Sequence, residues 1–395
     1  MEDFDFEVAS FVPYALDQIL IVGAGMAGSL LAFVLSRAGY GVTVFDPHRR
    51  PPPMFRNEKL GDEQIVLLRR YDALSCFADV CWPPEGHPHA YPADARPSLT
   101  DCGAPHHAWL TSVRDAWPAN VRFVEAAVDS IATSDDMQVV TTATGERFAG
   151  RLVVVATGRA PRLLDELGLR RRAISPGHSV CLGFSVALDS SPSVVVQGLP
   201  GAGIGYVSIF PMPGETRVNV FSYRPLDDPW TRRMSRSPLE ALAEVSPDAA
   251  EILAGARVVR RCEARGTDLY RVDQPARDGV VLIGDAFHAP CPASGTGMLR
   301  ILNDIDVLAR THIPQWLGSE GMARTKIARF YADPAKRRID RRSLSISLRA
   351  RGSKVGRGPY WALHRTAVGV RSALRTAIAA APVRRAAVSR PQPGV

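Results

Sequence analysis

Three glycines near the amino end of the chain have the spacing of a nucleotide-binding turn. They form the pattern G-x-G-x-x-G, and an aspartate ends the next apolar run along the chain. Glycines at these positions permit a tight turn, a close approach of the backbone to a pyrophosphate and close packing of a helix on a strand, while the acid can bind a ribose hydroxyl. The pattern predicts an adenine dinucleotide bound at Gly23, Gly25, Met26, Ala27, Gly28 and Asp46.

A second group of chemically useful residues lies late in the chain, in the segment IGDAFHAPCPASGTG. Gly284 and Asp285 follow an apolar run, which places a carboxylate at the end of a predicted strand. Ser294 to Gly297 then bring small residues and free backbone N–H groups to the start of a predicted helix. These parts suit a polyhydroxyl chain and the anionic or electron-rich edge of a ring.

Buried strands and one helix must position both groups. Residues 19–22 form a short apolar run typical of a buried strand, and residues 26–35 repeat apolar residues at helical spacing. Further strands are predicted at 41–45, 152–158 and 279–283. The alternatives are a membrane span, which needs roughly 20 apolar residues, and a βαβ unit with fortuitous glycines. The ordered series of strand, glycines, helix, strand and acid favours nucleotide binding over both.

A separate antiparallel sheet is indicated by the alternating pattern of residues 179–223. Alternate side chains of a strand face the same side. One face therefore offers a mixed polar and aromatic surface for an aromatic or polyketide-like molecule: Tyr206, Ser208, Phe210, Arg217, Asn219 and Phe221. Ordinary sheet packing explains the alternation equally well. Residues 227–260 are predicted to be helical.

The sequence resembles the FAD-dependent monooxygenases of the aromatic hydroxylase type, including polyprenyl-methoxyphenol hydroxylase-like proteins. The resemblance rests on GAGMAG, VVVATG and IGDAFHAPCPASGTG, which occur in that order within residues 17–310. It implies that Gly284 and Asp285 hold the ribityl chain of FAD. It also implies that a second set lies against the isoalloxazine: Pro292, Gly295, Thr296 and Gly297. In such proteins NADH or NADPH reduces FAD transiently, and oxygen then forms a flavin C4a-hydroperoxide that oxygenates the substrate.

The middle motif departs from the family's pattern, because the strand ends in Thr157 and Gly158 where many hydroxylases carry an Asp-Gly pair. The chain looks closer to an uncharacterised branch that keeps the segment EKL and a later glutamine. By this likeness the cofactor contacts also include Lys59, Gln64, Thr157 and Gly158. The fold often places arginines against FAD where Arg56 and Arg114 stand, and a plain surface charge is the alternative for each.

Three other functions compete with hydroxylation. A flavin-dependent halogenase shares the motifs, but its usual W-x-W-x-I-P signature is missing from this sequence. A geranylgeranyl-reductase-like flavoprotein would form its product without oxygen. A non-enzymatic protein that retains FAD would consume no NAD(P)H with any substrate. His288 lies near the flavin by analogy and is a further candidate for the substrate pocket, and a structural histidine is favoured there over a proton shuttle.

Composition limits the remaining classes. The chain has 395 residues, 46% of them hydrophobic, and a net charge of +8. Residues 336–395 hold 15 Lys or Arg against one acid, for +14, which leaves −6 on the first 335 residues.

Six scattered cysteines without metal-ligand spacing predict reduced thiols in the cytoplasm and no metal site. The loose histidine cluster His87, His89, His106 and His107 is predicted to lie in surface loops rather than on a metal.

The basic tail has three interpretations. Docking on the acidic body is favoured. Peripheral contact with an anionic membrane is the second, through an apolar stripe with basic flanks: Leu363, Ala367, Val370, Leu374 and Ile378. Nucleic acid is the third and is not expected, because no aromatic platform accompanies the arginines. Sedimentation of the full-length protein with anionic vesicles at low salt distinguishes membrane contact from docking.

The expected architecture is therefore an α/β protein with a Rossmann-like FAD-binding domain on a parallel sheet, an antiparallel-sheet substrate domain and a helical C-terminal tail. The predicted FAD-binding domain is discontinuous and covers residues 17–80, 106–178 and 275–312. The substrate domain covers 81–105 and 179–274, and the basic C-terminal region covers 313–395. The expected partners are a small-molecule substrate and molecular oxygen.

Overall fold

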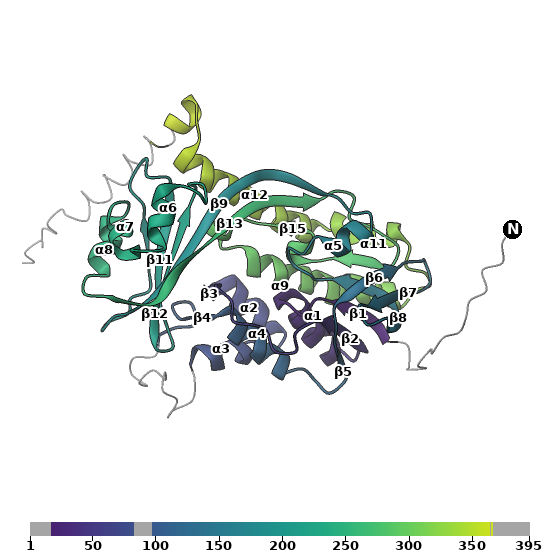
Figure 1. Cartoon of the computed structure of the whole chain (residues 1–395). Coiled ribbons are helices and arrows are strands. Elements are labelled where there is room, and N and C mark those ends of the chain that lie inside the picture. Colours follow the sequence, from purple (N-terminus) through teal and green to yellow (C-terminus); the bar gives the residue numbers. More distant parts are fainter. Residues whose placement is uncertain (1–16, 83–96, 364, 366–395) are drawn as a thin grey trace, which may run out of the picture.

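A computed structural model describes residues 17–82, 97–363 and 365. It contains a mixed sheet built around parallel strands, a separate antiparallel sheet, and helices that cover both (Figure 1). The parallel strands lie in the order β5 (Val121–Glu125), β2 (Val42–Asp46), β1 (Asp17–Val22), β8 (Arg147–Val155) and β14 (Val280–Leu282). The antiparallel strands β7 (Gln138–Thr142) and β6 (Val128–Ala132) extend this sheet beyond the first half of β8.

Apolar side chains on both faces of the parallel strands explain why the sheet is covered on both sides. On one face, the core includes residues of the helices α1 (Met26–Arg37), α3 (Ser75–Cys81), α4 (His106–Asp115) and α9 (Gly297–Val307). On the other face, Leu20, Val153 and Leu282 pack against α5 (Arg162–Glu166). The run 19–35 is thus a strand followed by a helix, as its two periods predict.

The antiparallel sheet has the order β10-β11-β12-β9-β13-β15. Its strands are β9 (Arg171–Ala187), β10 (Val194–Gln197), β11 (Ile204–Met212), β12 (Glu215–Ser222), β13 (Arg257–Val272) and β15 (His288–Ala289). One face packs on three short helices, α6 (Pro229–Met234), α7 (Pro238–Ala243) and α8 (Pro247–Ile252). These confirm most of the predicted helical stretch 227–260, but its last residues belong to β13 instead.

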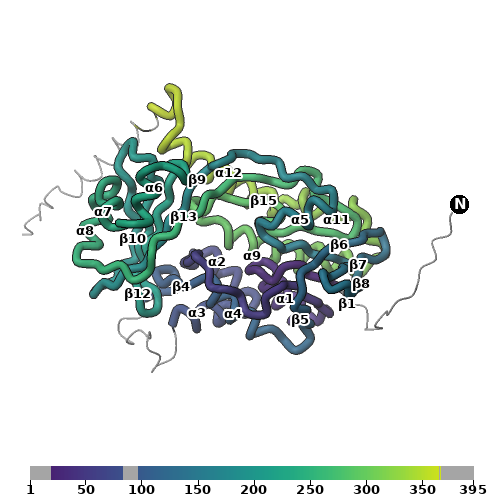
Figure 2. Tube along the Cα trace, viewed as in Figure 1, coloured from purple at the N-terminus to yellow at the C-terminus, as the bar shows by residue number. Residues whose placement is uncertain are grey.

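Two long strands join the two parts of the molecule. The pairing of β9 with β13 runs from Ala187 opposite Arg257 to Arg171 opposite Val272. Figure 2 shows this ribbon passing from the side of α6–α8 to the side of α5. Residues 171–178, which the predicted boundaries give to the FAD-binding domain, therefore belong to a strand of the antiparallel sheet.

A two-stranded antiparallel ribbon lies between the two parts. It is formed by β3 (Asn57–Lys59) and β4 (Gly103–Pro105), and α2 (Asp62–Arg70) follows β3 in the chain. The range 81–105 was assigned to the substrate domain, yet Cys81, Cys102 and Ala104 pack in the core of the parallel sheet. The domain boundaries stay a prediction, and this range is the part that the packing supports least.

The C-terminal region is helical, as predicted. After α9 the chain makes one wider turn (Leu308–His312) into α10 (Ile313–Leu317), and α11 (Arg324–Ala332) and α12 (Pro334–Val355) follow. Asp333 caps α12 by accepting hydrogen bonds from the N–H groups of Ala335 and Lys336. No helix within the described ranges has both the length and the apolar character to cross a membrane. The predicted stripe beyond Leu363 lies outside the described residues.

Candidate cofactor and substrate site

The glycine turn between β1 and α1 has the conformation that the motif predicts. Gly23 has φ +98°, and a Cβ there would lie 2.8 Å from the carbonyl oxygen of Ala156. A Cβ on Gly28 would overlap the carbonyl oxygen of Gly23. Around Gly25, by contrast, the closest atom to a Cβ is the same Ala156 oxygen at 4.0 Å. The turn is therefore packed at its two outer glycines and open at the middle one, where α1 begins.

Asp46 and Arg114 fasten this turn to the end of β2. One carboxylate oxygen of Asp46 accepts a hydrogen bond from Ala24 N at 2.9 Å, and the other accepts from His48 N at 3.0 Å. Arg114 donates to the carbonyl oxygens of Ala24, His48 and Arg49. The guanidinium, predicted to face the cofactor, thus holds the backbone that would surround it.

Three strand ends meet at this turn. Val22, Val155 and Leu282 are aligned across β1, β8 and β14, so the residues that follow them share one edge of the sheet. Gly284 has φ +58°, and a Cβ on it would lie 3.4 Å from Cβ of Ala27 in α1. The early and late motifs, far apart in the sequence, are therefore in contact.

The ends of β8 and β14 carry the next polar groups. The hydroxyl oxygen of Thr157 is buried without a hydrogen-bond partner, and Gly158 has φ +61°. Arg159 Nε lies 3.5 Å from a carboxylate oxygen of Asp285. Tyr270 on β13 donates to the carbonyl oxygen of Asp285 at 2.9 Å. The Asp285 turn is thus held by one long strand while its carboxylate stays 28% exposed.

The second predicted cofactor segment forms a tight loop ahead of α9. Residues Pro292–Ser294 make one 3-10 turn, and Gly295 continues it with φ +63°. Ser294 donates to the carbonyl oxygen of Cys291 at 2.7 Å, and the Ser294 and Thr296 hydroxyls are 2.7 Å apart. Over Gly297, the position of a Cβ would be 3.6 Å from Arg56 Nη2. Arg56 therefore reaches the start of α9, and its contact with the cofactor stays a prediction.

Arg56 also leads to a buried acid and histidine. It forms an ion pair with Glu58. Glu58 Oε1, the oxygen paired with Arg56, lies 3.7 Å from His106 Nδ1, and this nitrogen is buried without a hydrogen-bond partner. Burial and the nearby charge of Arg56 hold the pKa of His106 well below its ordinary value. The site therefore holds a neutral imidazole beside a carboxylate, and Nδ1 of His106 can form a hydrogen bond with a further polar group.

Two other predicted contacts have structural partners. Lys59 donates to Ser193 Oγ at 2.8 Å and lies 5.6 Å from the ring centre of Phe210, so it links the β3–β4 ribbon to the antiparallel sheet. Gln64 Oε1 accepts a hydrogen bond from Gly61 N at 3.1 Å and closes the first turn of α2. Neither contact requires a cofactor.

The six predicted substrate residues do share one face of the sheet. They pair across β11 and β12 as Tyr206 with Phe221, Ser208 with Asn219 and Phe210 with Arg217. Two of them form hydrogen bonds to the chain at β3: Arg217 donates to the carbonyl oxygen of Phe55 at 3.0 Å, and Asn219 donates to that of Asn57 at 3.2 Å. Tyr206 instead donates to Ala293 at 3.1 Å, within the glycine-rich loop before α9.

His288 is buried on β15, and neither of its ring nitrogens has a hydrogen-bond partner. Burial lowers its pKa against the opposing effect of Asp340, whose carboxylate lies 3.9 Å from Nδ1. Its carbonyl oxygen accepts a hydrogen bond from Arg300. No group of three or more metal-ligating side chains occurs among the residues that the structure describes, and His87 and His89 lie outside them.

Sequence reasoning missed several residues around this edge of the sheet. Arg159 directly follows the middle motif, which was a usable signal. Arg300 and Asp304 are charged positions, one helical turn apart, within an otherwise apolar stretch of α9. Lys336 and Asp340 of α12 gave no signal, because nothing in the sequence relates them to a motif so far upstream.

The chemistry of this edge fits a flavin dinucleotide. Gly25 leaves open space beside the free N–H groups at the start of α1, which suits a pyrophosphate. The exposed carboxylate of Asp285 and the unpartnered hydroxyl of Thr157 suit a polyhydroxyl chain. The turn from Pro292 to Gly297 offers small residues and backbone N–H groups at the start of α9, which suits the edge of a ring. The fold and this set of residues together define a class of flavin-dependent oxidoreductase.

Comparison with known proteins agrees with this class. The chain belongs to the FAD binding domain family, whose model matches residues 17–311. It is 28% identical to kynurenine 3-monooxygenase of Salinispora arenicola over 336 residues, which cover 74% of this chain and 71% of that protein. It is 26% identical to the ubiquinone hydroxylase UbiL of Rhodospirillum rubrum over 355 residues, 80% and 76% of the two chains.

Solved structures share the fold. PqsL of Pseudomonas aeruginosa, determined in complex with 2-aminobenzoylacetate, superposes with a TM-score of 0.67 at 20% identity, covering 86% of this chain and 97% of PqsL. The protein is an FAD-dependent monooxygenase of the aromatic hydroxylase type, an oxidoreductase with FAD as its cofactor and NAD(P)H as the reductant.

Proposed function

We propose that this monooxygenase hydroxylates an aromatic or polyketide-like small molecule, with NADH or NADPH reducing FAD and molecular oxygen as co-substrate. When bound, FAD supplies the redox and oxygen chemistry, while the protein binds, orients and shields the substrate. Two relatives named for kynurenine and ubiquinone support a ring-bearing substrate. Halogenation and isoprenoid reduction stay alternatives that the test below separates.

The contact between Tyr206 and the glycine-rich loop is the observation that carries the proposal. Tyr206 donates to Ala293, and its ring lies 4.5 Å from that of Phe221 at an interplanar angle of 39°. Burial raises the pKa of Tyr206, so its phenol stays protonated and keeps this hydrogen bond. An aromatic wall of the antiparallel sheet is therefore fixed next to the segment assigned to the flavin ring, where a planar substrate would stack.

Glu58 and His106 are the proposed polar end of the substrate site. His106 Nδ1 is buried without a hydrogen-bond partner, which is unfavourable, whereas Glu58 is already ion-paired with Arg56. A substrate hydroxyl group at this position would donate to the Glu58 carboxylate, which only accepts, and would hydrogen-bond to Nδ1 of His106.

Oxygen incorporation tests the reaction class. With a phenolic substrate that accelerates NAD(P)H consumption, one oxygen atom of the product should come from oxygen-18 gas, with one NAD(P)H used per product. Mass spectrometry of the product in labelled gas and, separately, in labelled water gives the answer. Label from water alone, a halogenated product in the presence of halide, or an unoxygenated reduced product would each overturn hydroxylation.

The Asp285→Ala variant tests the cofactor site. It should weaken FAD binding about 10- to 150-fold, because a hydrogen bond to a charged group contributes roughly 1.5–3 kcal/mol. Asp273→Ala is the matched control, since Asp273 forms an exposed ion pair with Arg172 at 3.1 Å. Both variants are dialysed and their bound flavin is measured by absorbance. An Asp285→Ala protein that stays as yellow as the control contradicts the assignment.

We also propose a cytoplasmic location. None of the six cysteines forms a disulfide, and five of them are buried, as expected for a protein of a reducing compartment. Contact of the basic tail with an anionic membrane stays a prediction. Its first stripe residue, Leu363, is 74% exposed beside Tyr360, and the others lie outside the described residues.

A further inference from the structure

The inner face of α12 is a polar stripe rather than an apolar one. Lys336, Asp340, Ser343 and Ser347 recur at intervals of four, three and four residues, which places them along one side of the helix. Lys336, Ser343 and Ser347 are fully buried, and the Asp340 side chain is 16% exposed. The helix lies beyond residues 17–311, the part that matches the FAD binding domain family.

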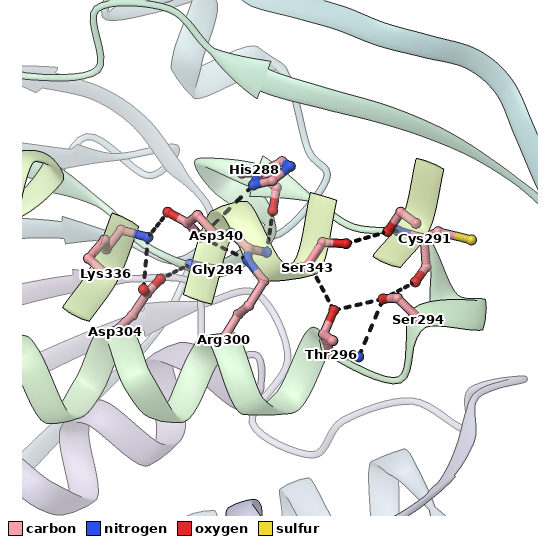
Figure 3. Close-up of polar contacts among 11 residues, drawn as sticks. Gly284, His288, Cys291, Ser294, Thr296, Arg300, Asp304, Lys336, Asp340 and Ser343 are labelled. Carbon is pink, nitrogen blue, oxygen red and sulfur yellow. Dashed lines mark hydrogen bonds and ion pairs between the residues drawn. The ribbon is translucent and has the colours of Figure 1, made fainter. Parts of the chain in front are cut away.

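The first half of the stripe joins a chain of buried ion pairs (Figure 3). Lys336 Nζ lies 2.8 Å from Asp304 and 3.0 Å from Asp340. Asp340 lies 2.9 Å from Arg300 Nε. The two acids and two bases balance in charge.

Both ends of this chain hold the backbone of the Asp285 turn. Asp304 accepts a hydrogen bond from Gly284 N at 3.1 Å. Arg300 donates to the carbonyl oxygen of His288 at 2.7 Å. The backbone on either side of Asp285 is therefore fixed by charged side chains of α9, and these are fixed in turn by α12.

The second half of the stripe holds the glycine-rich loop. Ser343 Oγ lies 2.6 Å from Thr296 Oγ1, and Thr296 is itself 2.7 Å from Ser294 Oγ. Ser347 Oγ accepts from Cys291 N at 3.3 Å and donates to the carbonyl oxygen of Ser343. Figure 3 shows the Ser294–Thr296 turn facing Ser343 on the helix.

Stability alone does not explain a buried polar stripe. Buried ion pairs are often no more stabilising than apolar side chains of the same volume, because desolvation offsets their attraction. Directional bonds to backbone groups do, however, fix the positions of those groups more sharply than apolar packing does. Ser343 and Ser347 reach the glycine-rich loop directly, whereas Lys336 and Asp340 act on the Asp285 turn through Asp304 and Arg300.

We propose that Lys336, Asp340, Ser343 and Ser347 are positioning residues that set the Asp285 turn and the glycine-rich loop for FAD. The inference rests on the proposed cofactor site. It assigns the C-terminal helix a role in cofactor binding, and within the described residues its side chains hydrogen-bond directly to one predicted cofactor contact, Thr296. A purely structural helix would affect folding and leave the affinity of the folded protein unchanged.

A double serine variant tests the second half of the stripe. Ser343→Ala/Ser347→Ala should raise the Kd for FAD about tenfold, because two hydrogen bonds to the loop are lost. Ser345→Ala is the matched control, as Ser345 is half-buried on the same helix and makes no hydrogen bond in the described structure. The apoproteins are titrated with FAD without urea, and binding is followed by flavin fluorescence. Urea denaturation first shows that each variant is fully folded under these conditions.

The charge chain is tested by Asp304→Asn/Lys336→Met, which removes one charge of each sign. It should also raise the Kd for FAD at least about tenfold. If this variant does not fold, the serine variant decides alone. A Kd within twofold of that of Ser345→Ala in the folded stripe variants overturns the proposal. Asp285→Ala separates the cofactor site from the positioning role. An unchanged Kd for FAD in Asp285→Ala would overturn the cofactor site itself. A raised Kd in Asp285→Ala together with an unchanged Kd in the stripe variants overturns only the positioning role.

Discussion

Gly25→Ala should abolish FAD binding and leave the apoprotein folded. Gly25 has φ −67°, which alanine adopts without strain, and the closest atom to the added Cβ is 4.0 Å away. The methyl group would occupy the space where the backbone approaches the pyrophosphate. We expect the Kd for FAD to rise about 100-fold or more, a loss of roughly 3 kcal/mol, with the urea midpoint of the apoprotein nearly unchanged.

Gly28→Ala is the contrasting variant in the same motif. Its Cβ would overlap the carbonyl oxygen of Gly23, a backbone atom that cannot move without opening the turn. Overpacking of this kind costs about 1–3 kcal/mol, so urea denaturation of the apoprotein should show a clear loss of stability. A Gly25→Ala protein that binds FAD normally, or one destabilised as much as Gly28→Ala, contradicts this division of roles.

The sequence predicted the strands and turns of this sheet edge well because its signals are local. The glycine spacing, the buried runs and the acid at each strand end fix turns and strands within a few residues of themselves. Parallel strands then bring their carboxyl ends to one edge, which is how Gly284 comes to lie against Ala27. Alternation likewise identified the shared face of Tyr206 and Phe221, because the period of a strand is two.

The partners of long side chains could not be predicted in the same way. Arg114 and Gln64 were expected to face the cofactor, but they donate to or accept from backbone groups nearby. A guanidinium or an amide binds equally well to a ligand and to a turn, so residue type does not separate the two. Residues 257–260 were expected to be helical, yet pairing with β9 makes them part of β13, a tertiary contact that outweighs local propensity.

The role of α12 was hidden for a different reason. A docked helix usually shows an apolar stripe, and this helix buries one lysine and two serines beside a single apolar residue, Ile339. Its basic residues suggested docking through overall charge. The contacts are more specific: Ser347 accepts from Cys291 N, and Lys336 pairs with Asp304, which accepts from Gly284 N.

Lys336→Met should be strongly destabilising. The side chain is fully buried, lies 2.8 Å from Asp304 and 3.0 Å from Asp340, and packs over the rings of Phe287 and Phe330. Methionine can fill the apolar part of this space but leaves Asp304 without a cation. Removing one partner of a buried pair costs about 3–5 kcal/mol, measured by urea denaturation at pH 7.5. Arg342→Ala is the control on the same helix, since its ion pair with Glu63 is exposed and contributes at most about 1 kcal/mol.

The pH dependence of this loss follows from Asp340. Burial alone would raise the pKa of Asp340, but the charge of Lys336, with contributions from His288 and Arg300, holds that pKa well below its usual range. Because this pKa is lowered, the charged Asp340 stabilises the folded wild type at pH values above the ordinary aspartate pKa of about 3.9. This stabilisation is lost as the pH falls below that value. Lys336→Met lacks most of that contribution at every pH. The stability gap to the wild type should therefore be largest above about pH 5 and narrow as the pH falls through about 4. A gap that widens in acid, or a loss at pH 7.5 no larger than that of Arg342→Ala, would show that Lys336 does not hold the Asp340 carboxylate in the charged state.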